Sequence, residues 1–195
     1  MTAAMTEAEV LAALEEAHAV LSGHFKLTSG RHSDRYVQCA RVLEDPALVT
    51  RLANAMLERI GKRRIDLVAA PAVGGIIIGF AVAQALGVKF IFTEREAGAM
   101  ALRRGFEVPE GACVLVVEDV VTTGGSVAEV VELVQRAGGE VVAVASLIDR
   151  GGPKAFDAEL LPLLRLEVES WDAEACRLCA ADVPLYAPGS RSLAK

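Results

Sequence analysis

Two adjacent carboxylates, Glu118 and Asp119, stand at the end of an apolar run in the segment VLVVEDVVTTGGSVAEVV, residues 114–131. Residues 114–117 are typical of a buried strand, so both acids should emerge at its carboxyl end. Residues 122–126 then lead into an expected helix. Free N–H groups at a helix N-terminus, together with a glycine-rich turn, form a cradle for a phosphate dianion. The segment therefore combines acids with an expected anion site.

The hydroxyls of Thr122, Thr123 and Ser126 can donate to the same phosphate, and Gly124 and Gly125 let the backbone approach it closely. The two acids lie too near to face that phosphate and suit vicinal hydroxyls better. A phosphate at one end and a diol at the other describe a ribose 5-phosphate. The alternative is a turn with an ordinary helix cap. The pattern is neither a Walker loop nor a dinucleotide fingerprint.

The elements around this loop alternate between strands and helices. Periodicity predicts strands at 65–70, 88–92, 113–117 and 141–148 and helices at 75–86 and 126–137. Such alternation predicts an α/β fold, a mostly parallel sheet flanked by helices. Ligands in these sheets bind beyond the carboxyl ends of the strands. The loops there, at 71–75, 93–106, 118–126 and 149–153, all hold glycine or charge.

The N-terminal part predicts two further helices. Thr6 and Glu9 form a capping box, and Gly23 is placed to end the first helix. The pair at 45–46, Asp-Pro, should begin a second helix that Gly61 ends. Between them, residues 20–43 are turn-rich and should form short strands lying over the main domain as a hood, together with the C-terminal segment.

Bulk composition limits the function classes. A chain of 195 residues suits one domain, residues 1–195, and its 53% hydrophobic content predicts a large core. The net charge of −6 and pI of about 5.2 argue against nucleic-acid or anionic-membrane binding, but not against a small anionic substrate. Residues 67–88 carry no charge, yet Pro71, Gly74 and Gly75 break them into pieces too short to span a bilayer. No signal peptide is evident.

The four cysteines are too few and scattered for a disulfide framework, which favours a reducing cytoplasm. Cys176 and Cys179 have the spacing of half a zinc site, but no second pair exists and the histidines lie far off in sequence. Two nearby thiols are the favoured interpretation, and a metal or redox role is the alternative.

The chain resembles a known family of proteins. VLVVEDVVTTGGS looks like the phosphoribosyl pyrophosphate (PRPP) loop of the type I phosphoribosyltransferases. Three further stretches resemble the orotate phosphoribosyltransferases among them: GHFKLTSGRHSDRYVQ at 23–38, LIDR ending at Arg150, and PGSR at 188–191. With PAVGG at 71–75, the resemblance covers the chain nearly end to end.

The resemblance implies a set of site residues. PRPP would be bound by Glu118, Asp119, Val120, Val121, Thr122, Thr123, Gly124, Gly125, Ser126 and Arg95. The pyrophosphate loop would be Ala72, Val73, Gly74 and Gly75, and orotate would contact Thr122, Arg150 and Lys26. A guanidinium fork matches the orotate carboxylate, although a surface arginine closing the strand is the alternative for Arg150. Arg95 and Asp119 would be the catalytic residues.

The chain also departs from the family pattern. Many members carry lysine at the position of Gly74. The family's flexible catalytic loop usually carries further basic residues, but this chain reads EREAGAMALRRG from residue 94. Arg95, Arg103 and Arg104 would then supply the positive charge, across a dimer interface as in the family. The alternative is that Arg103 and Arg104 are simply solvated on a hairpin.

The implied reaction converts orotate and PRPP into orotidine 5-monophosphate and pyrophosphate, a step of pyrimidine (UMP) biosynthesis, with Mg²⁺ as cofactor. Mg²⁺ keeps water and substrate oxygens as ligands, so no protein side chain is assigned to a metal. The expected assembly is a cytoplasmic homodimer with no nucleic-acid or membrane partner. Two alternatives remain: a phosphoribosyltransferase for a purine base, and a non-catalytic regulator that senses PRPP.

Overall fold

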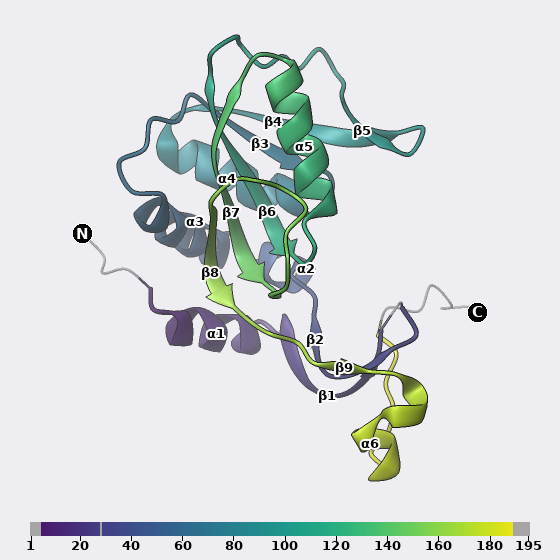
Figure 1. Ribbon diagram of the computed structural model, residues 1–195. Coiled ribbons are helices and arrows are strands. Elements are labelled where there is room, and N and C mark those ends of the chain that lie inside the picture. Colours follow the sequence, from purple (N-terminus) through teal and green to yellow (C-terminus); the bar gives the residue numbers. More distant parts are fainter. Residues whose placement is uncertain (1–4, 28, 189–195) are drawn as a thin grey trace.

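The structure, a computed structural model, describes residues 5–27 and 29–188 (Figure 1). Of the PGSR stretch that resembles the family, only Pro188 is among them, and the rest lies outside the described residues.

A six-stranded sheet forms the centre of the molecule. From edge to edge it contains β5 (Ala99–Leu102), β4 (Lys89–Glu96), β3 (Leu67–Pro71), β6 (Cys113–Val121), β7 (Glu140–Asp149) and β8 (Leu160–Arg165). Every neighbouring pair is parallel except β4 and β5. The predicted α/β fold with a mostly parallel sheet is confirmed.

Helices cover both faces of this sheet. α1 (Glu7–Glu16), α3 (Pro46–Ile60) and α4 (Gly74–Leu86) pack in one core cluster, and α5 (Gly125–Arg136) packs in the other. Strand β6 divides its side chains between the two faces. Leu115 and Val117 belong to the first cluster and Val114 and Val116 to the second. This alternation follows from the two-residue period of a strand, and it explains why the run is apolar at every position.

The hood is a three-stranded sheet of β1 (Val20–Lys26), β2 (His32–Val37) and β9 (Ser170–Trp171). The short helix α2 (Ala40–Leu43) connects it to α3. The last described elements are η1 (Ala173–Ala175) and α6 (Arg177–Ala180). Figure 1 shows the hood beyond the arrowheads of β6, β7 and β8, so it lies on the side of the carboxyl ends of the parallel strands.

Several predicted helix ends are confirmed. Thr6 and Glu9 form the capping box of α1. The Asp45 carboxylate accepts the backbone N–H groups that begin α3, and Gly61 ends that helix with φ of 68°. The assignment of Gly23 is wrong: α1 ends seven residues earlier, and Gly23 lies inside β1 at a break in the register with β2. A glycine at a strand irregularity gives the same sequence signal as a glycine after a helix.

The segment expected to be a loop after residue 92 is a hairpin. β4 continues to Glu96 and pairs antiparallel with β5. Ala97 and Gly98 between them both have positive φ, 50° and 91°, which is the geometry of a two-residue hairpin turn that follows the strand twist. The prediction of a loop was wrong because Ala-Gly is a weaker turn signal than Asn-Gly.

Residues 67–88, the uncharged run, fold as β3 and α4 as predicted. Among the residues that the structure describes, no helix is both long enough and apolar enough to cross a membrane.

Candidate active site

The acid pair lies within strand β6. The sequence predicted that the strand ends at residue 117 and that residues 118–126 form a loop, but β6 continues to Val121 and pairs with β7 as far as Asp149. The turn is confined to residues 122–124. Glu118 and Asp119 are therefore held on a regular strand, which positions them more rigidly than a loop would.

The N-terminus of α5 faces an open pocket. Gly124 precedes the helix with a left-handed φ of 76°, and no side chain of the described residues caps the first turn. The first N–H groups of a helix have no partner within it, so they remain available to an anion. The pocket measures about 290 Å³ and is lined by Arg95, Glu118, Val120, Val121, Thr122, Thr123, Gly124, Gly125, Ser126, Val127 and Glu129. A side-chain carbon at Gly125 would meet no atom within 4 Å.

The two acids also pack against the first turn of α4. A side-chain carbon at Gly74 would lie 2.6 Å from Asp119 Oδ1, and one at Gly75 would lie 3.2 Å from Glu118 Oε1. The glycines of the expected pyrophosphate loop are therefore needed for this close approach. Val73, Gly74 and Asp119 line a second pocket of about 310 Å³. The structure thus brings the pyrophosphate loop and the acid pair together.

Burial sets the protonation of Glu118. Burial, with a smaller contribution from the neighbouring Asp119 carboxylate, raises the pKa of this carboxyl to about 9, while the Asp119 backbone N–H acts in the opposite direction. With this pKa, Glu118 is a neutral acid near pH 7. A neutral carboxyl both donates and accepts a hydrogen bond, as a sugar hydroxyl partner requires.

Lys154, which the sequence analysis missed, joins two of the loops. Its Nζ donates to the Thr122 and Gly151 carbonyl oxygens, each at 2.8 Å, and pairs with Asp149 Oδ1 at 2.6 Å. Ala155 N–H donates to the Thr123 carbonyl at 2.8 Å. The loop after β7 therefore holds the turn after β6 in place. A lysine directly after the glycine-rich DRGGP stretch was the available signal.

Arg150 lies at the end of β7, and its backbone N–H donates to the Val121 carbonyl at 2.9 Å. Its Nε is buried and has no hydrogen-bond partner among the described residues. Burial also lowers the pKa of the guanidinium. An unpartnered buried donor is costly, so this group is better explained by a ligand than by a solvated surface arginine.

The pyrophosphate loop begins where β3 ends. Ala72 N–H donates to the Thr93 carbonyl at 2.8 Å, and the peptide between Ala72 and Val73 is cis. The Val73 side chain is 81% exposed. Lys26, expected at orotate, lies at the end of β1 with an exposed side chain and lines neither pocket described above.

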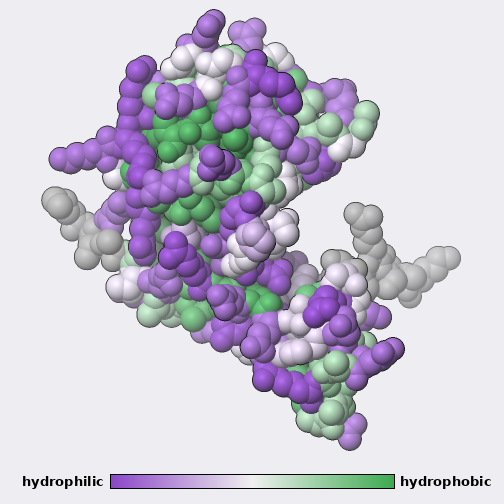
Figure 2. Space-filling view, in the orientation of Figure 1, coloured by the Kyte–Doolittle hydropathy of each residue, from purple (hydrophilic) through white to green (hydrophobic). Residues whose placement is uncertain are grey.

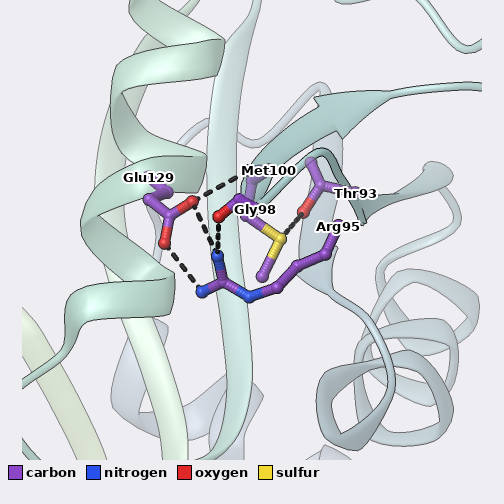
Figure 3. A network of polar contacts seen from close by, with 5 residues as sticks. All are labelled: Thr93, Arg95, Gly98, Met100 and Glu129. Carbon is purple, nitrogen blue, oxygen red and sulfur yellow. Dashed lines mark hydrogen bonds and ion pairs between the residues drawn. The ribbon is translucent and has the colours of Figure 1, made fainter.

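Arg95 reaches the pocket from β4 but is already paired. Figure 3 shows its guanidinium held by both oxygens of Glu129, at 2.8 and 3.2 Å, and by the Gly98 carbonyl at 2.8 Å. Glu129 Oε2 also accepts the Met100 N–H at 2.8 Å. These hydrogen bonds, that of Arg95 foremost, lower the pKa of Glu129. Glu129, which the sequence analysis missed, thus fastens the hairpin to α5.

The other two arginines of the hairpin lie elsewhere. Arg104 pairs with Glu94 through two hydrogen bonds of 2.7 and 2.9 Å, and Arg103 lies 3.7 Å from Glu96. Both side chains are exposed. In this chain they fit the alternative of solvated hairpin charges, and their predicted role at the pyrophosphate stays a prediction.

Comparisons with known proteins show the family to which the chain belongs. Residues 39–172 match the family described as phosphoribosyl transferase domain. The chain is 50% identical to an orotate phosphoribosyltransferase of Heliobacterium modesticaldum, with 96% of this chain and 100% of the relative covered. It is also 50% identical to that of Acidithiobacillus ferrooxidans, with 97% and 100% covered.

A solved orotate phosphoribosyltransferase from Aeropyrum pernix superposes with a TM-score of 0.72 at 28% identity, covering 81% of this chain and 94% of that one. The chain therefore belongs to the phosphoribosyltransferase family and, within it, to the orotate phosphoribosyltransferases.

Proposed function

We propose that this chain transfers the phosphoribosyl group of PRPP to orotate, giving orotidine 5-monophosphate and pyrophosphate in pyrimidine (UMP) biosynthesis. The bond from ribose C1 to a pyrophosphate oxygen breaks, a bond from C1 to a ring nitrogen of orotate forms, and the proton of that nitrogen is released. The observation that carries the proposal is the uncapped N-terminus of α5, which opens into a pocket bordered by hydroxyls and by the acid Glu118.

In this proposal the 5-phosphate binds the first turn of α5. The backbone N–H groups there and the hydroxyls of Thr122, Thr123 and Ser126 supply the donors, and the helix dipole favours the negative charge. No neighbouring protein atom lies within 4 Å of a side-chain carbon placed at Gly125, which leaves room for the phosphate oxygens.

The ribose would lie along the acid pair. Glu118, neutral near pH 7, donates to one hydroxyl and accepts from another, and Asp119 accepts from the neighbouring hydroxyl. The transition state has oxocarbenium character at C1, so the Asp119 carboxylate also stabilises developing positive charge. Catalysis then rests on positioning and charge, without a protein nucleophile.

The leaving pyrophosphate would lie over the loop 72–75, where backbone N–H groups precede α4. The Asp119 carboxylate lines the pocket beside this loop and would offer an oxygen to Mg²⁺, a cation that prefers oxygen ligands and keeps several waters. Mg²⁺ bound with the substrate would neutralise pyrophosphate charge. Arg95 adds a positive charge at the rim of the α5 pocket, where Glu129 fixes its position.

Orotate would be recognised by Arg150. Its buried unpartnered Nε and the guanidinium fork match the planar carboxylate of orotate, and its backbone is bonded to the strand that carries the acids. Thr122 lies in the adjoining turn. Lys26 contributes from the hood only if the hood approaches the pocket when substrate is bound.

We also infer a cytoplasmic homodimer, the chain 1–195 acting as one domain. An apolar stripe on and beside α4 supports the dimer: Val73, Ile77 and Phe80 are 81%, 47% and 58% exposed and follow helical spacing. Val73 belongs to the pyrophosphate loop, so a partner on this stripe would border the site. Phe80→Asp should give monomers in light scattering, and dimers of that variant would contradict the inference.

The decisive assay mixes the protein with orotate, PRPP and Mg²⁺ and follows orotate absorbance. Turnover of orotate is expected. Arg150→Ala should raise the KM for orotate by about 10- to 100-fold, which corresponds to the free energy of a hydrogen bond between charged groups. PRPP affinity should stay unchanged in that variant.

Turnover with adenine or guanine in place of orotate would favour the purine alternative. PRPP binding without any turnover would favour the regulator.

A further inference from the structure

A cluster of four metal-binding side chains lies in the hood, apart from the two pockets. His24 comes from β1 and His32 from β2, while Cys176 directly precedes α6 and Cys179 lies within it. Their donor atoms all lie within 4.8 Å of one another. The sequence separates the two pairs by more than 140 residues, so only the fold brings them together.

The spacing of the donors matches a tetrahedral site. His24 Nε2 lies 3.1 Å from His32 Nδ1 and 3.4 Å from Cys176 Sγ. Cys179 Sγ lies 3.7 Å from His24 Nε2 and 3.2 Å from His32 Nδ1. Four ligands at zinc bond lengths in a tetrahedron have their donor atoms about 3.3–3.8 Å apart. One ion therefore fits at the centre with only small shifts of the side chains.

The protonation of the cluster also suits a metal. His24 Nδ1 lies 2.8 Å from the Val183 carbonyl, which can only accept a hydrogen bond, so Nδ1 carries the proton. In the neutral imidazole Nε2 is then an unprotonated ligand directed at the cluster. A backbone carbonyl that orients a ligating histidine in this way is the usual support of a zinc ligand.

The charge balance permits burial of the ion. His24, His32 and Cys176 are 3%, 4% and 3% exposed. Two thiolates and two neutral imidazoles carry a charge of −2, which a divalent cation cancels. Binding exchanges Zn²⁺ for two thiol protons, so the occupied site buries no net charge.

The segment that follows β9 lacks a core of its own. Of the described residues 172–188, only Cys176 is buried, and α6 is a single helical turn of four residues. Figure 2 shows this segment, at lower right, as a narrow lobe projecting from the body. Helices this short are unstable alone, and small segments without a core usually need a disulfide or a bound metal to stabilise them. The chain after α6 nevertheless returns to pair with the hood, where Tyr186 bridges Phe25.

We propose that His24, His32, Cys176 and Cys179 bind one structural Zn²⁺ that fastens the C-terminal segment to the hood. Four protein ligands close the coordination sphere, so the ion has no open position for substrate and acts on structure alone. Without metal, the same atoms would form only weak thiol and imidazole hydrogen bonds.

The test is the metal content of the full-length protein purified with a thiol reductant. Wild-type protein and the control Cys113→Ser, whose thiol lies in β6, should each retain about one zinc per chain by mass spectrometry of the metal. Cys176→Ser and Cys179→Ser should retain almost none. Cys179 is exposed, so its variant should keep the wild-type far-UV circular dichroism. The readout does not depend on turnover.

A second measurement uses only wild-type protein, so it does not depend on whether the variants fold. Wild-type protein stripped with a chelator and titrated with Co²⁺ should develop the intense visible bands of tetrahedral cobalt together with a thiolate charge-transfer band, saturating at about one ion per chain. Loss of these bands on adding Zn²⁺ would support the site. Reduced wild-type protein that takes up neither ion, or thiols found joined as a disulfide after purification, would overturn it.

Discussion

Two helix N-termini face the carboxyl edge of the sheet, and they differ in what occupies the space in front of them. At α4, Gly74 and Gly75 lie directly against the protein's own acid pair. At α5, Gly125 opens onto a pocket bordered by hydroxyls. Both ends lack a side-chain cap in the described structure. The same local motif, glycine before a helix, thus serves close packing in one place and ligand space in the other.

The largest expected effect is at the open end. Gly125→Val should weaken PRPP binding by about 100-fold or more, equivalent to about 2.7 kcal/mol, because the new side chain fills the pocket at the first turn of α5. The fold should persist, since nothing lies within 4 Å of the added carbon. Calorimetric titration with PRPP and thermal unfolding measure the two quantities.

Gly124→Ala is the matched comparison within the same turn. Gly124 has a φ of 76°, and its added carbon would collide with the Phe156 ring. This variant should lose about 1–3 kcal/mol of stability. Wild-type affinity in Gly125→Val, or wild-type stability in Gly124→Ala, would remove the distinction between packing and ligand space.

At the closed end, Gly74→Ala should weaken PRPP binding by about tenfold, or about 1.4 kcal/mol, because the added carbon displaces the Asp119 carboxylate. The same titration measures it. Gln84→Ala, an exposed change at the other end of α4, is the control and should bind PRPP normally. Equal affinities for both variants would show that the packing of Asp119 against α4 is unimportant.

A separate effect concerns how stability depends on pH. The pKa of Glu118 is raised from 4.5 to about 9, so the folded state binds this proton more tightly than the unfolded state does. That contribution to stability is complete below pH 4.5 and is lost as the pH rises through about 9. The free energy of unfolding that is lost between pH 6 and pH 9 should be smaller in Glu118→Gln than in the wild type. The difference should exceed about 1.4 kcal/mol, the equivalent of one pKa unit. Urea unfolding at both pH values checks it, and parallel curves for the two proteins would refute it.

The smallest effect lies outside both helix ends. Arg104 pairs with Glu94 on the exposed hairpin and lines neither pocket. Arg104→Ala should change kcat and the KM for PRPP by less than about twofold, because exposed ion pairs contribute little. A kcat reduced tenfold or more would support the expectation that Arg104 supplies positive charge to the active site.

The regular elements of this fold could be predicted from the sequence because local signals define them. Asp45 and Gly61 mark the ends of α3, and the run at 114–117 indicates a buried strand. The extension of β6 to Val121 could not be foreseen, since it depends on pairing with β7. Gly23 was wrongly assigned to a helix end because glycine is common both at strand bulges and at the ends of helices.

The residues of the candidate sites also divide into those set by local sequence and those set by contacts between distant segments. Thr122–Ser126 stand next to each other in sequence, and their role follows from a contiguous motif. Lys154, Glu129 and the histidine–cysteine cluster act through contacts between distant segments. Such contacts depend on strand register and loop closure, which a single sequence does not reveal. The pairing of His24 with Cys176 across 152 residues is the extreme case.

The most direct measurement is a crystal structure of the protein with PRPP bound. The 5-phosphate oxygens should lie within hydrogen-bond distance of the backbone N–H groups at the start of α5 and of the Thr123 and Ser126 hydroxyls, with the ribose diol against Glu118 and Asp119. A 5-phosphate held elsewhere while the α5 pocket contains only solvent would contradict the assignment of this loop, and with it the proposed geometry of the reaction.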